Sequence, residues 1–393
     1  MRLAAILLAG ALPALAQDAA AQVRMVREHM TQVLAQQPNY TCLETIERAI
    51  RNSREKNFKT IDVVKLEVAL VNGTEMFAWP GSKQFEDTDI RHFVPSGMFG
   101  SGDFALYARA VFAGRSTHVA LAGQTQLDQK TVARYDFSVP SEDGMRILVE
   151  GKSTLAGYHG SFYAESGTLD VLRMEVVADS LPPALATRVI TDSMDYQRVQ
   201  IGGGSFLLPA SSDVVMIDAR GDTSQNRIAF SSCREFTGES TLRFDDAPAE
   251  ASAAPASKRE ITLPKGLSLE LRLADDIDTA AAAVGDTVHA TLYSDVKHKG
   301  EILLAKGTQI SGRIVRLERN ADYTVLGLMF DQADAQNAHA DLSLTFDTAT
   351  GAPLLTSHAR WSIASPIRPH EGLLPLPPGH LRAGRGILLF WRS

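Results

Sequence analysis

The sequence has little of the chemistry that marks an enzyme or a metalloprotein. Its 393 residues include only two cysteines, Cys42 and Cys233, and no histidine or further cysteine lies at ligand spacing from either, which argues against a zinc site. The ten histidines are scattered, and no pair has metal-ligand spacing on one predicted helix. The nucleophile-elbow serine motif, the two-histidine zinc motif and the phosphate-binding glycine loop are all missing. The sequence therefore indicates no catalytic residues, no metal site and no cofactor.

A strong excess of one charge is also missing. The 39 Lys and Arg residues against 46 Asp and Glu residues give a formal net charge of −7. Arg2 is the only charged residue among residues 1–16, so loss of that segment changes the charge from −7 to −8. Nucleic-acid-binding proteins present a basic face, and no run rich in Lys or Arg appears. We therefore expect no nucleic-acid partner.

Beyond its first residues, the sequence lacks any apolar run long enough to cross a membrane as a helix. The opening MRLAAILLAGALPALAQ has one basic residue, an apolar stretch and an Ala-x-Ala site, which is typical of a secretory signal peptide. Pro13 interrupts the stretch, which is shorter than the roughly 20 residues of a membrane span. No cysteine follows the site, so no lipid anchor is expected. We predict cleavage after Ala16 and an exported protein, with the bacterial periplasm as its expected compartment and no transmembrane segment in the mature chain.

Export bears on the two cysteines, because an oxidising compartment favours a disulfide bond. Cys42 lies in the first predicted strand and Cys233 in the last strand of the first predicted domain, so a bridge between them would close that domain end to end. Loop-closure entropy for so long a ring gives roughly 5 kcal/mol as an upper bound on the stabilisation. The alternative is a pair of buried thiols.

Hydrophobic periodicity predicts mainly strands. Residues 23–37 have apolar positions at helical spacing before Pro38, which predicts a helix with one apolar stripe. Most of the next two hundred residues alternate with period two between turn residues, and such a long meander indicates an antiparallel sheet. One further helix is predicted within residues 103–112, with Phe104 and Tyr107 among its apolar positions.

The stretch LEVALVNGTEMFAW contains the strongest hairpin signal. Asn72-Gly73 separates two apolar runs, and both central residues of a type I′ turn need positive φ. Pairing outward from the turn places the large side chains on one face, namely Leu66, Val68, Leu70, Phe77 and Trp79. Full burial of each of these five side chains stabilises the folded protein by about 1.5–3 kcal/mol. We therefore expect other groups to cover them. Either the chain's own helices cover them, through Phe104 and Tyr107, or a bound apolar ligand shares the space; these seven residues are the candidate ligand-binding residues.

Composition divides the chain into segments. Residues 246–258 are rich in Ala, Pro and Ser with no large apolar residue, which predicts a linker between a first domain at 23–245 and a second at 259–350. A proline-rich extension follows at 351–393, with a strand predicted at 384–391.

The second predicted domain repeats a short phrase. Leu263-Pro264-Lys265-Gly266 and Leu304-Ala305-Lys306-Gly307 each precede a strand of period two, and Leu381-Arg382-Ala383-Gly384 is a weaker third copy. A glycine at the turn before each strand favours a small barrel in which similar tight turns, or corners, lead into the strands.

Two runs of the first domain resemble a known family. GSFYAESGTLDVLRMEVVA followed by MDYQRVQIGGGSFLLPASSDVV is similar to the strand, acidic-x-x-Gly turn, strand, Tyr-x-x-Val, Gly, Leu-Pro order of outer-membrane lipoprotein-sorting proteins of the LolA and LolB type. The resemblance covers roughly residues 23–245. It implies an incomplete barrel that wraps around helices and holds lipid acyl chains on its apolar concave face. The expected disulfide and the second domain depart from that family.

The second domain resembles the small β-barrel of TrbI-type proteins from conjugation and type IV secretion machines. The matching positions are Pro264, Gly266, Gly285, Asp286, Leu304 and Gly307. The resemblance implies a barrel that packs into oligomeric rings. Because the transmembrane anchor of that family is not predicted here, a role as a secretion channel does not follow.

We therefore predict a mainly β protein, with an antiparallel half-barrel that carries an N-terminal helix and an inserted helix, linked to a second small β-barrel domain. The first functional hypothesis is a non-enzymatic cell-envelope protein that binds a lipid or a lipoprotein acyl chain in the half-barrel and docks onto an envelope protein through the second barrel. The alternatives are a structural interaction protein without a small ligand and a hydrolase with an unrecognised site.

Overall fold

A computed structural model describes residues 11–82, 85, 90, 93, 106–149, 152–236, 259–336, 338–351, 354–355, 362–363, 366–377 and 387–393. The chain divides into two compact units. The first unit comprises residues 1–59, 68–76 and 98–237, and the second comprises residues 60–67, 77–97 and 238–393. The predicted linker 246–258, Phe104 and the third repeat at 381–384 lie outside the described residues.

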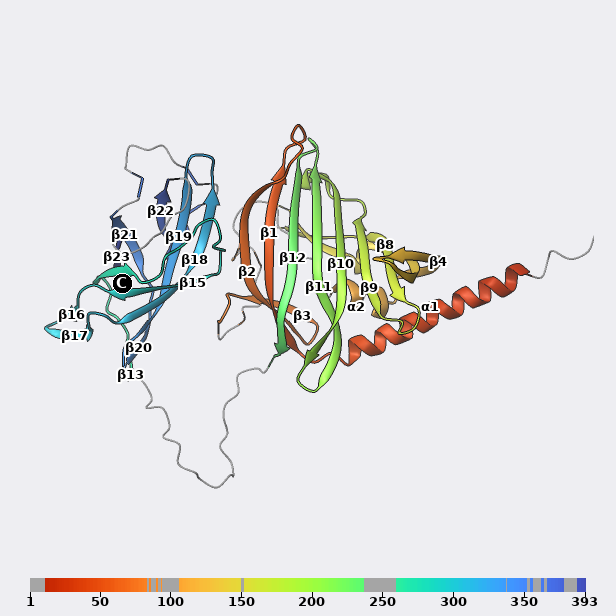
Figure 1. Cartoon of the computed structure of the whole chain (residues 1–393), viewed down its shortest axis with the longest axis horizontal. Helices are drawn as coiled ribbons and strands as arrows, with labels where there is room; N and C mark the ends of the chain where they lie inside the picture. Colours follow the sequence, from red (N-terminus) through yellow and green to blue (C-terminus); the bar gives the residue numbers. More distant parts are fainter. Residues whose placement is uncertain are drawn as a thin grey trace, which may run out of the picture. The chain divides into compact units, whose positions relative to one another are not determined.

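Ten strands form the larger sheet, in the order β3-β2-β1-β12-β11-β10-β9-β8-β5-β4. Figure 1 shows the strands from β2 to β9 side by side as a curved layer. Alternating burial along β5 gives the sheet one buried and one solvated face. The strands are β1 (Tyr40–Arg51), β2 (Lys59–Val71), β3 (Thr74–Ala78), β4 (His118–Leu127), β5 (Lys130–Val139), β8 (Tyr158–Glu165), β9 (Val171–Ala178), β10 (Thr187–Ile201), β11 (Gly204–Asp218) and β12 (Thr223–Glu235). This curled half-barrel confirms the predicted fold class.

The predicted hairpin between β2 and β3 is present. Asn72 and Gly73 both have positive φ, of 52° and 81°, as a type I′ turn requires. β2 ends at Val71 and β3 begins at Thr74, so the loop has the predicted two residues. Local turn chemistry alone was therefore enough to place this hairpin.

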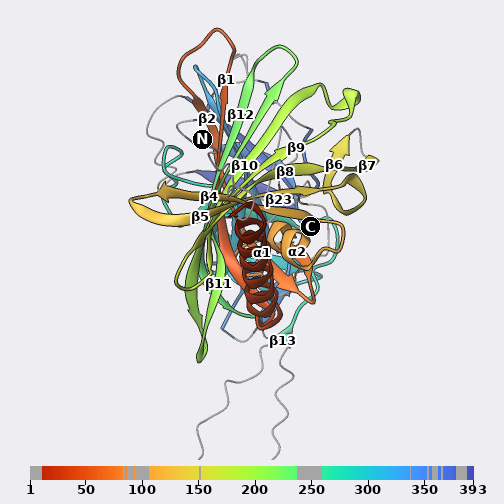
Figure 2. The ribbon, with the colours of Figure 1, turned by 90° about the vertical axis from the view of Figure 1, so that its right-hand side faces the viewer.

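Two helices pack against the curved sheet, and Figure 2 shows them next to each other in front of it. Helix α2 (Leu106–Ala113) begins within the predicted range 103–112 and ends one residue beyond it. Helix α1 (Ala11–Ala35) begins 12 residues before the predicted start at Val23, so the predicted start was wrong. Residues 11–22 are rich in Ala and Leu, which are strong helix formers, and Pro13 is tolerated because amides of the first helical turn need no intrahelical partner. Two 3₁₀ turns lie at Ser141–Asp143 and Pro183–Leu185.

The pairing register places one row of side chains on the face that the helices cover. Directly opposed residues of antiparallel strands share a face, so the pairs can be followed from β1 to β5. The row runs through Ile46, Ile228, Ser212, Met194, Met174, Phe162 and Tyr135. The ring of Phe162 lies 4.9 Å from the ring of Phe112 in α2, so this row faces the helices. We call this concave side the inner face.

Several strands were missed by the sequence analysis. β4 is rich in small and polar residues, so its period-two alternation is not visible as apolar and polar residues in turn. β6 (Met145–Val149) and β7 (Lys152–Ala156) form a separate two-stranded ribbon. β11 runs without a break through Pro209. Its register with β10 shifts beside Pro209, and proline is tolerated in a sheet at such irregularities.

The second unit contains a nine-stranded sheet in the order β13-β20-β19-β18-β15-β14-β23-β21, with β22 paired to β19. Its strands are β13 (Arg259–Glu260), β14 (Ser268–Leu273), β15 (Thr287–Leu292), β18 (Gln309–Arg319), β19 (Thr324–Asp334), β20 (Ala338–Asp341), β21 (Thr345–Thr350), β22 (Gly372–Leu376) and β23 (Leu388–Arg392). β16 (Val296–His298) and β17 (Glu301–Leu304) form a small ribbon. β23 confirms the strand predicted near the C-terminus, whereas β22 lies in the proline-rich extension, where no strand was predicted before residue 384.

This sheet curls into a small barrel. Gly372 of β22 lies so close to β21 that a Cβ atom there would sit 2.7 Å from the ring of Phe346. The two repeated phrases form the predicted corners, because Gly266 and Gly307 have φ of 88° and 84° directly before β14 and β18. Only glycine adopts such angles at no steric cost, which is why the phrase recurs.

Candidate ligand-binding face

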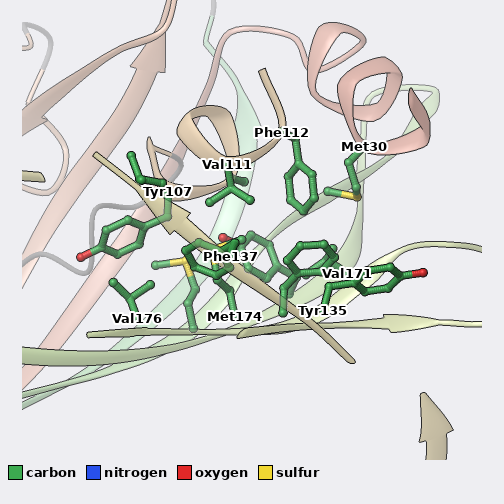
Figure 3. Packing of buried hydrophobic residues seen from close by; sticks show 14 of the residues in the cluster. Met30, Tyr107, Val111, Phe112, Tyr135, Phe137, Val171, Met174 and Val176 are labelled. Atoms are coloured by element: carbon green, nitrogen blue, oxygen red, sulfur yellow. The ribbon is translucent and has the colours of Figure 1, made fainter. Parts of the chain in front are cut away.

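The inner face of the first unit is lined by aromatic rings. The rings of Tyr135 and Phe162 stack with 4.8 Å between their centroids, and the ring of Phe137 meets that of Tyr158 edge-on at 6.2 Å. Figure 3 shows Tyr135 and Phe137 with Met174 and Val176 beneath the helical side chains. These side chains give the sheet a continuous apolar surface from β5 to β10.

Helices α1 and α2 cover this surface. Val26 and Met30 of α1 and Val111 and Phe112 of α2 are buried against it, together with Leu34. The α1 positions are four residues apart, and Val111 and Phe112 of α2 follow the buried pair Tyr107 and Ala108 by four, so each helix presents one apolar stripe, as the sequence predicted for α1. In this structure the chain's own side chains occupy the concave side of the sheet.

Polar side chains tie α1 to α2. Arg27 Nη2 donates to the carbonyl oxygen of Gly114 at 3.0 Å, and Thr31 Oγ1 donates to that of Phe112 at 3.3 Å. Both bonds end at the last turn of α2 or just beyond it, where carbonyl groups have no partner within the helix. The two helices are therefore bonded to each other as well as to the sheet.

One ion cluster ties α1 to the sheet. His29 Nε2 lies 2.8 Å from Oδ1 of Asp170, and Arg198 donates two hydrogen bonds to the same carboxylate at 2.6 and 2.8 Å. Burial raises the pKa of Asp170, but the hydrogen bonds from Arg198 and His29 outweigh it and lower the pKa below its usual value of 3.8. At the end of α1, Gln37 Nε2 also donates to the carbonyl oxygen of Leu207 at 2.8 Å.

Another part of the inner face carries buried polar groups. Glu44 lies two residues before Ile46, and Tyr196 lies two residues after Met194, so both belong to the inner face. Glu44 is completely buried. Neither of its carboxyl oxygens, nor the Tyr196 hydroxyl, has a hydrogen-bond partner among the residues that the structure describes.

Helix α2 adds a cation to these groups. Arg109 donates through Nη2 to Oε1 of Gln37 at 3.1 Å, while its buried Nε is unpaired within the described part of the chain. Tyr40 and Glu75 are also close, because the charges of Arg109 and Glu75 both act on Tyr40. We call Tyr40, Glu44, Glu75, Arg109 and Tyr196 the buried polar cluster.

Burial dominates the electrostatics of this cluster. It raises the pKa of Glu44 well above the usual 4.5, and the negative charge of Glu75 raises it further. Burial likewise raises the pKa of Tyr196 and of Tyr40 above 10.0. Glu44 therefore favours its neutral form, which offers one hydrogen-bond donor and an acceptor.

The sequence analysis missed this cluster. A signal was present, because Glu44 interrupts the apolar phase of the first strand, which runs through Tyr40, Cys42 and Ile46. No comparable signal marks Arg109 or Tyr196, whose positions depend on how α2 and β10 meet β1.

The structure buries most of the residues predicted to contact a ligand. Leu66, Val68 and Leu70 of β2 are completely or almost completely buried, and Phe77 of β3 is buried as well. Tyr107 belongs to the core of the first unit, with its ring centroid 5.4 Å from that of Tyr158.

Trp79 is half-buried and packs within the second unit. Its ring centroid lies 4.9 Å from that of Phe93, and the Arg313 guanidinium carbon lies 5.8 Å from the indole centroid. Thus Trp79 packs in one unit and Tyr107 in the other. Contact of the seven predicted residues with a ligand stays a prediction.

Cys42 and Cys233 form a disulfide bond, which confirms that prediction. The bond joins the neighbouring strands β1 and β12, whose register shifts between Thr41 and Leu43 beside it. Because both cysteines are bridged, the chain has no free thiol.

In the part of the chain that the structure describes, no group of three or more His, Cys, Asp or Glu side chains is arranged to hold a metal ion. Neither helix, over its described residues, combines the length and apolar character needed to span a bilayer.

Comparisons with known proteins found similarity at the level of structure. No family model matches the chain, and no curated protein matches it. A DUF1329 family protein from Desulfovibrio piger aligns with a TM-score of 0.31 and 13% identity, over 57% of this chain and 97% of that one. A LolA superfamily protein from Nitrosomonas europaea gives 0.29 and 11%, over 55% and 93%. A domain named as an outer membrane lipoprotein-sorting protein, from Vibrio parahaemolyticus, gives 0.28 and 10%, over 54% and 92%.

The names of the last two, LolA superfamily protein and outer membrane lipoprotein-sorting protein, are those of the family that the first domain resembles in sequence. The resemblance of the second domain to TrbI-type barrels stays a prediction.

Proposed function

We propose that this protein is an exported, non-enzymatic binding protein of the bacterial envelope that holds an apolar ligand between the inner face and helices α1 and α2. The small barrel of the second unit serves as its docking module for an envelope protein. The observation that carries the proposal is the aromatic inner face, which is covered by two helices from separate parts of the sequence. The signal peptide predicted at residues 1–16 supports export.

The way the helices are attached supports a movable cover. Because Arg27 and Thr31 bond α1 to the end of α2, the two helices can leave the sheet together. On the sheet side, α1 is held by His29 at Asp170 and by Gln37 at Leu207. The cover can then separate without breaking any strand pairing.

The energies of such an exchange are of similar size. Uncovering Val26, Met30 and Leu34 of α1 together with Val111 and Phe112 of α2 costs roughly 8–15 kcal/mol, at about 1.5–3 kcal/mol for each buried side chain. An acyl chain of about 16 methylenes that takes their place returns ~13 kcal/mol at ~0.8 kcal/mol each. A long acyl chain can therefore compete with the helices, whereas a short one cannot.

A cross-link between α1 and the sheet tests the proposal. His29→Cys with Asp170→Cys places two thiols at the α1 contact, and a short bismaleimide joins them, since the two native cysteines are already bridged. The same double variant without cross-linker is the matched control. Binding of oleate, delivered from cyclodextrin, should be lost on cross-linking and kept in the control. Equal binding in both samples would contradict a movable cover.

A second measurement needs no variant. Organic extraction and mass spectrometry of the purified protein should yield an acyl lipid in a stoichiometric amount. A lipid-free protein that takes up no oleate would remove the proposal altogether.

The near-complete burial of Val26, Met30 and Val111 favours a second candidate. In that case the half-barrel is filled permanently by its own helices, and the protein is a structural interaction module of the envelope. Its signature is a protein that binds no oleate with or without the cross-link.

A further inference from the structure

Building on the proposed function, we propose that the buried polar cluster binds an uncharged polar head group, of hydroxyl or amide type, on the ligand whose chain lies along the aromatic inner face. The geometry on which this rests is the meeting of unpaired polar atoms and apolar surface on one side of one sheet.

The unpaired groups are costly for the folded protein. A buried polar group without a partner costs roughly 1–3 kcal/mol, and nearly all such groups in folded proteins are paired. Here Glu44 leaves two oxygens unpaired, and Tyr196 and Arg109 each leave one atom unpaired among the described residues. A ligand that brings complementary hydrogen-bonding groups would recover this cost, whereas packing alone gives no reason to keep them.

The location of the cluster is right for the end of an apolar ligand. Tyr196 belongs to the buried core, next to Met194 of the inner row, and so it borders the aromatic surface. Glu44 lies on the same face further across the sheet, on β1. Arg109 of α2, one of the two helices of the cover, bonds to Gln37, and its charge acts on Tyr40 of the cluster. A molecule lying under the cover therefore meets apolar side chains first and the polar cluster at one end.

The chemistry of the cluster selects the type of head group. A neutral Glu44 and the Tyr196 hydroxyl each offer a donor and an acceptor, and the Nε of Arg109 offers a donor. A hydroxyl or an amide satisfies both kinds of partner at once. The positive charge of Arg109 and the negative charge of Glu75 both act on Tyr40 and offset each other, so a carboxylate would lose its hydration without meeting a net positive charge.

Three probes with the same acyl chain test the inference: monooleoylglycerol, methyl oleate and oleate, each titrated calorimetrically from cyclodextrin. The native protein should bind monooleoylglycerol at least tenfold more tightly than methyl oleate, which lacks a donor, and more tightly than oleate. Glu44→Leu and Tyr196→Phe should each bring the ratio of the first two affinities near one, mainly by weakening the binding of monooleoylglycerol. Tyr163→Phe is the control, because its hydroxyl bonds to Glu175 on the opposite face of the sheet and the ratio should persist.

The outcomes separate this inference from the proposed function. If the native protein binds all three probes equally, or if neither variant changes the ratio, the cluster is not a head-group site while the carrier function stands. Tighter binding of oleate would overturn the assignment of an uncharged head group. If no probe binds, both proposals fall. Urea unfolding of each variant guards against misfolding, and Glu44→Leu should be at least as stable as the native protein because it removes an unpaired buried carboxyl.

Discussion

Loss of the disulfide between Cys42 and Cys233 should destabilise the first unit strongly. The bridge spans 191 residues, and loop-closure entropy for a ring of that size corresponds to about 5 kcal/mol at 25 °C. Domains of this kind are stable by roughly 5–15 kcal/mol in total, so the bridge accounts for a third of that stability or more. Because the effect lies in the unfolded chain, the native pairing of β1 with β12 should survive the loss.

The measurement must report on the first unit alone. Trp79 and Trp391 belong to the second unit, so tryptophan fluorescence is unsuitable. Hydrogen–deuterium exchange can be followed on peptides of β1 and β12, with peptides of β18 as the internal reference. The comparison is between native protein with and without reductant and the double variant Cys42→Ala, Cys233→Ala under the same conditions.

Reduction should lower the free energy of opening of β1 and β12 by about 3–5 kcal/mol and leave that of β18 unchanged. The double variant should behave like the reduced protein and show no response to reductant. A change below about 1 kcal/mol in β1 and β12 would refute the loop-entropy reasoning. An equal change in β18 would show that the two units do not unfold independently.

Other predictions concern single residues. Asp170→Asn should lower the free energy of unfolding at pH 7 but not at pH 2–3. The pKa of the native carboxylate is lowered, so its contribution to the free energy of unfolding is present above its pKa in the unfolded chain, about 3.9, and is lost as the pH falls. Urea melts at both pH values check this. The pKa of Glu44 is raised in the folded protein. The contribution of Glu44 to the free energy of unfolding is therefore present below its ordinary pKa of 4.5 and is lost as the pH rises through its raised pKa. Glu44→Gln should therefore flatten the decline in stability above pH 5, and a parallel decline in both proteins would disprove it. Gly307→Ala should cost about 1–2 kcal/mol in urea melts because its φ is 84°, whereas Gly203→Ala, without a positive φ, should cost less.

The sequence by itself determined the local features. Asn72-Gly73 set the hairpin, because a type I′ turn depends on two adjacent residues. The glycines of the repeated phrase set two corners of the small barrel for the same reason. Period-two alternation identified most strands of the first unit, and it failed at β4, where small and polar residues take the place of large apolar ones.

Only the tertiary structure decided what meets on the inner face. Ile46, Met194 and Phe162 share a row because β1, β10 and β8 are aligned by pairing through intervening strands, and no local pattern specifies that register. The same holds for Glu44, whose lack of a partner depends on every element around it. Side chains far apart in sequence come together through the summed geometry of many strands, so the sequence indicated an apolar face while the fold alone placed polar groups at one end of it.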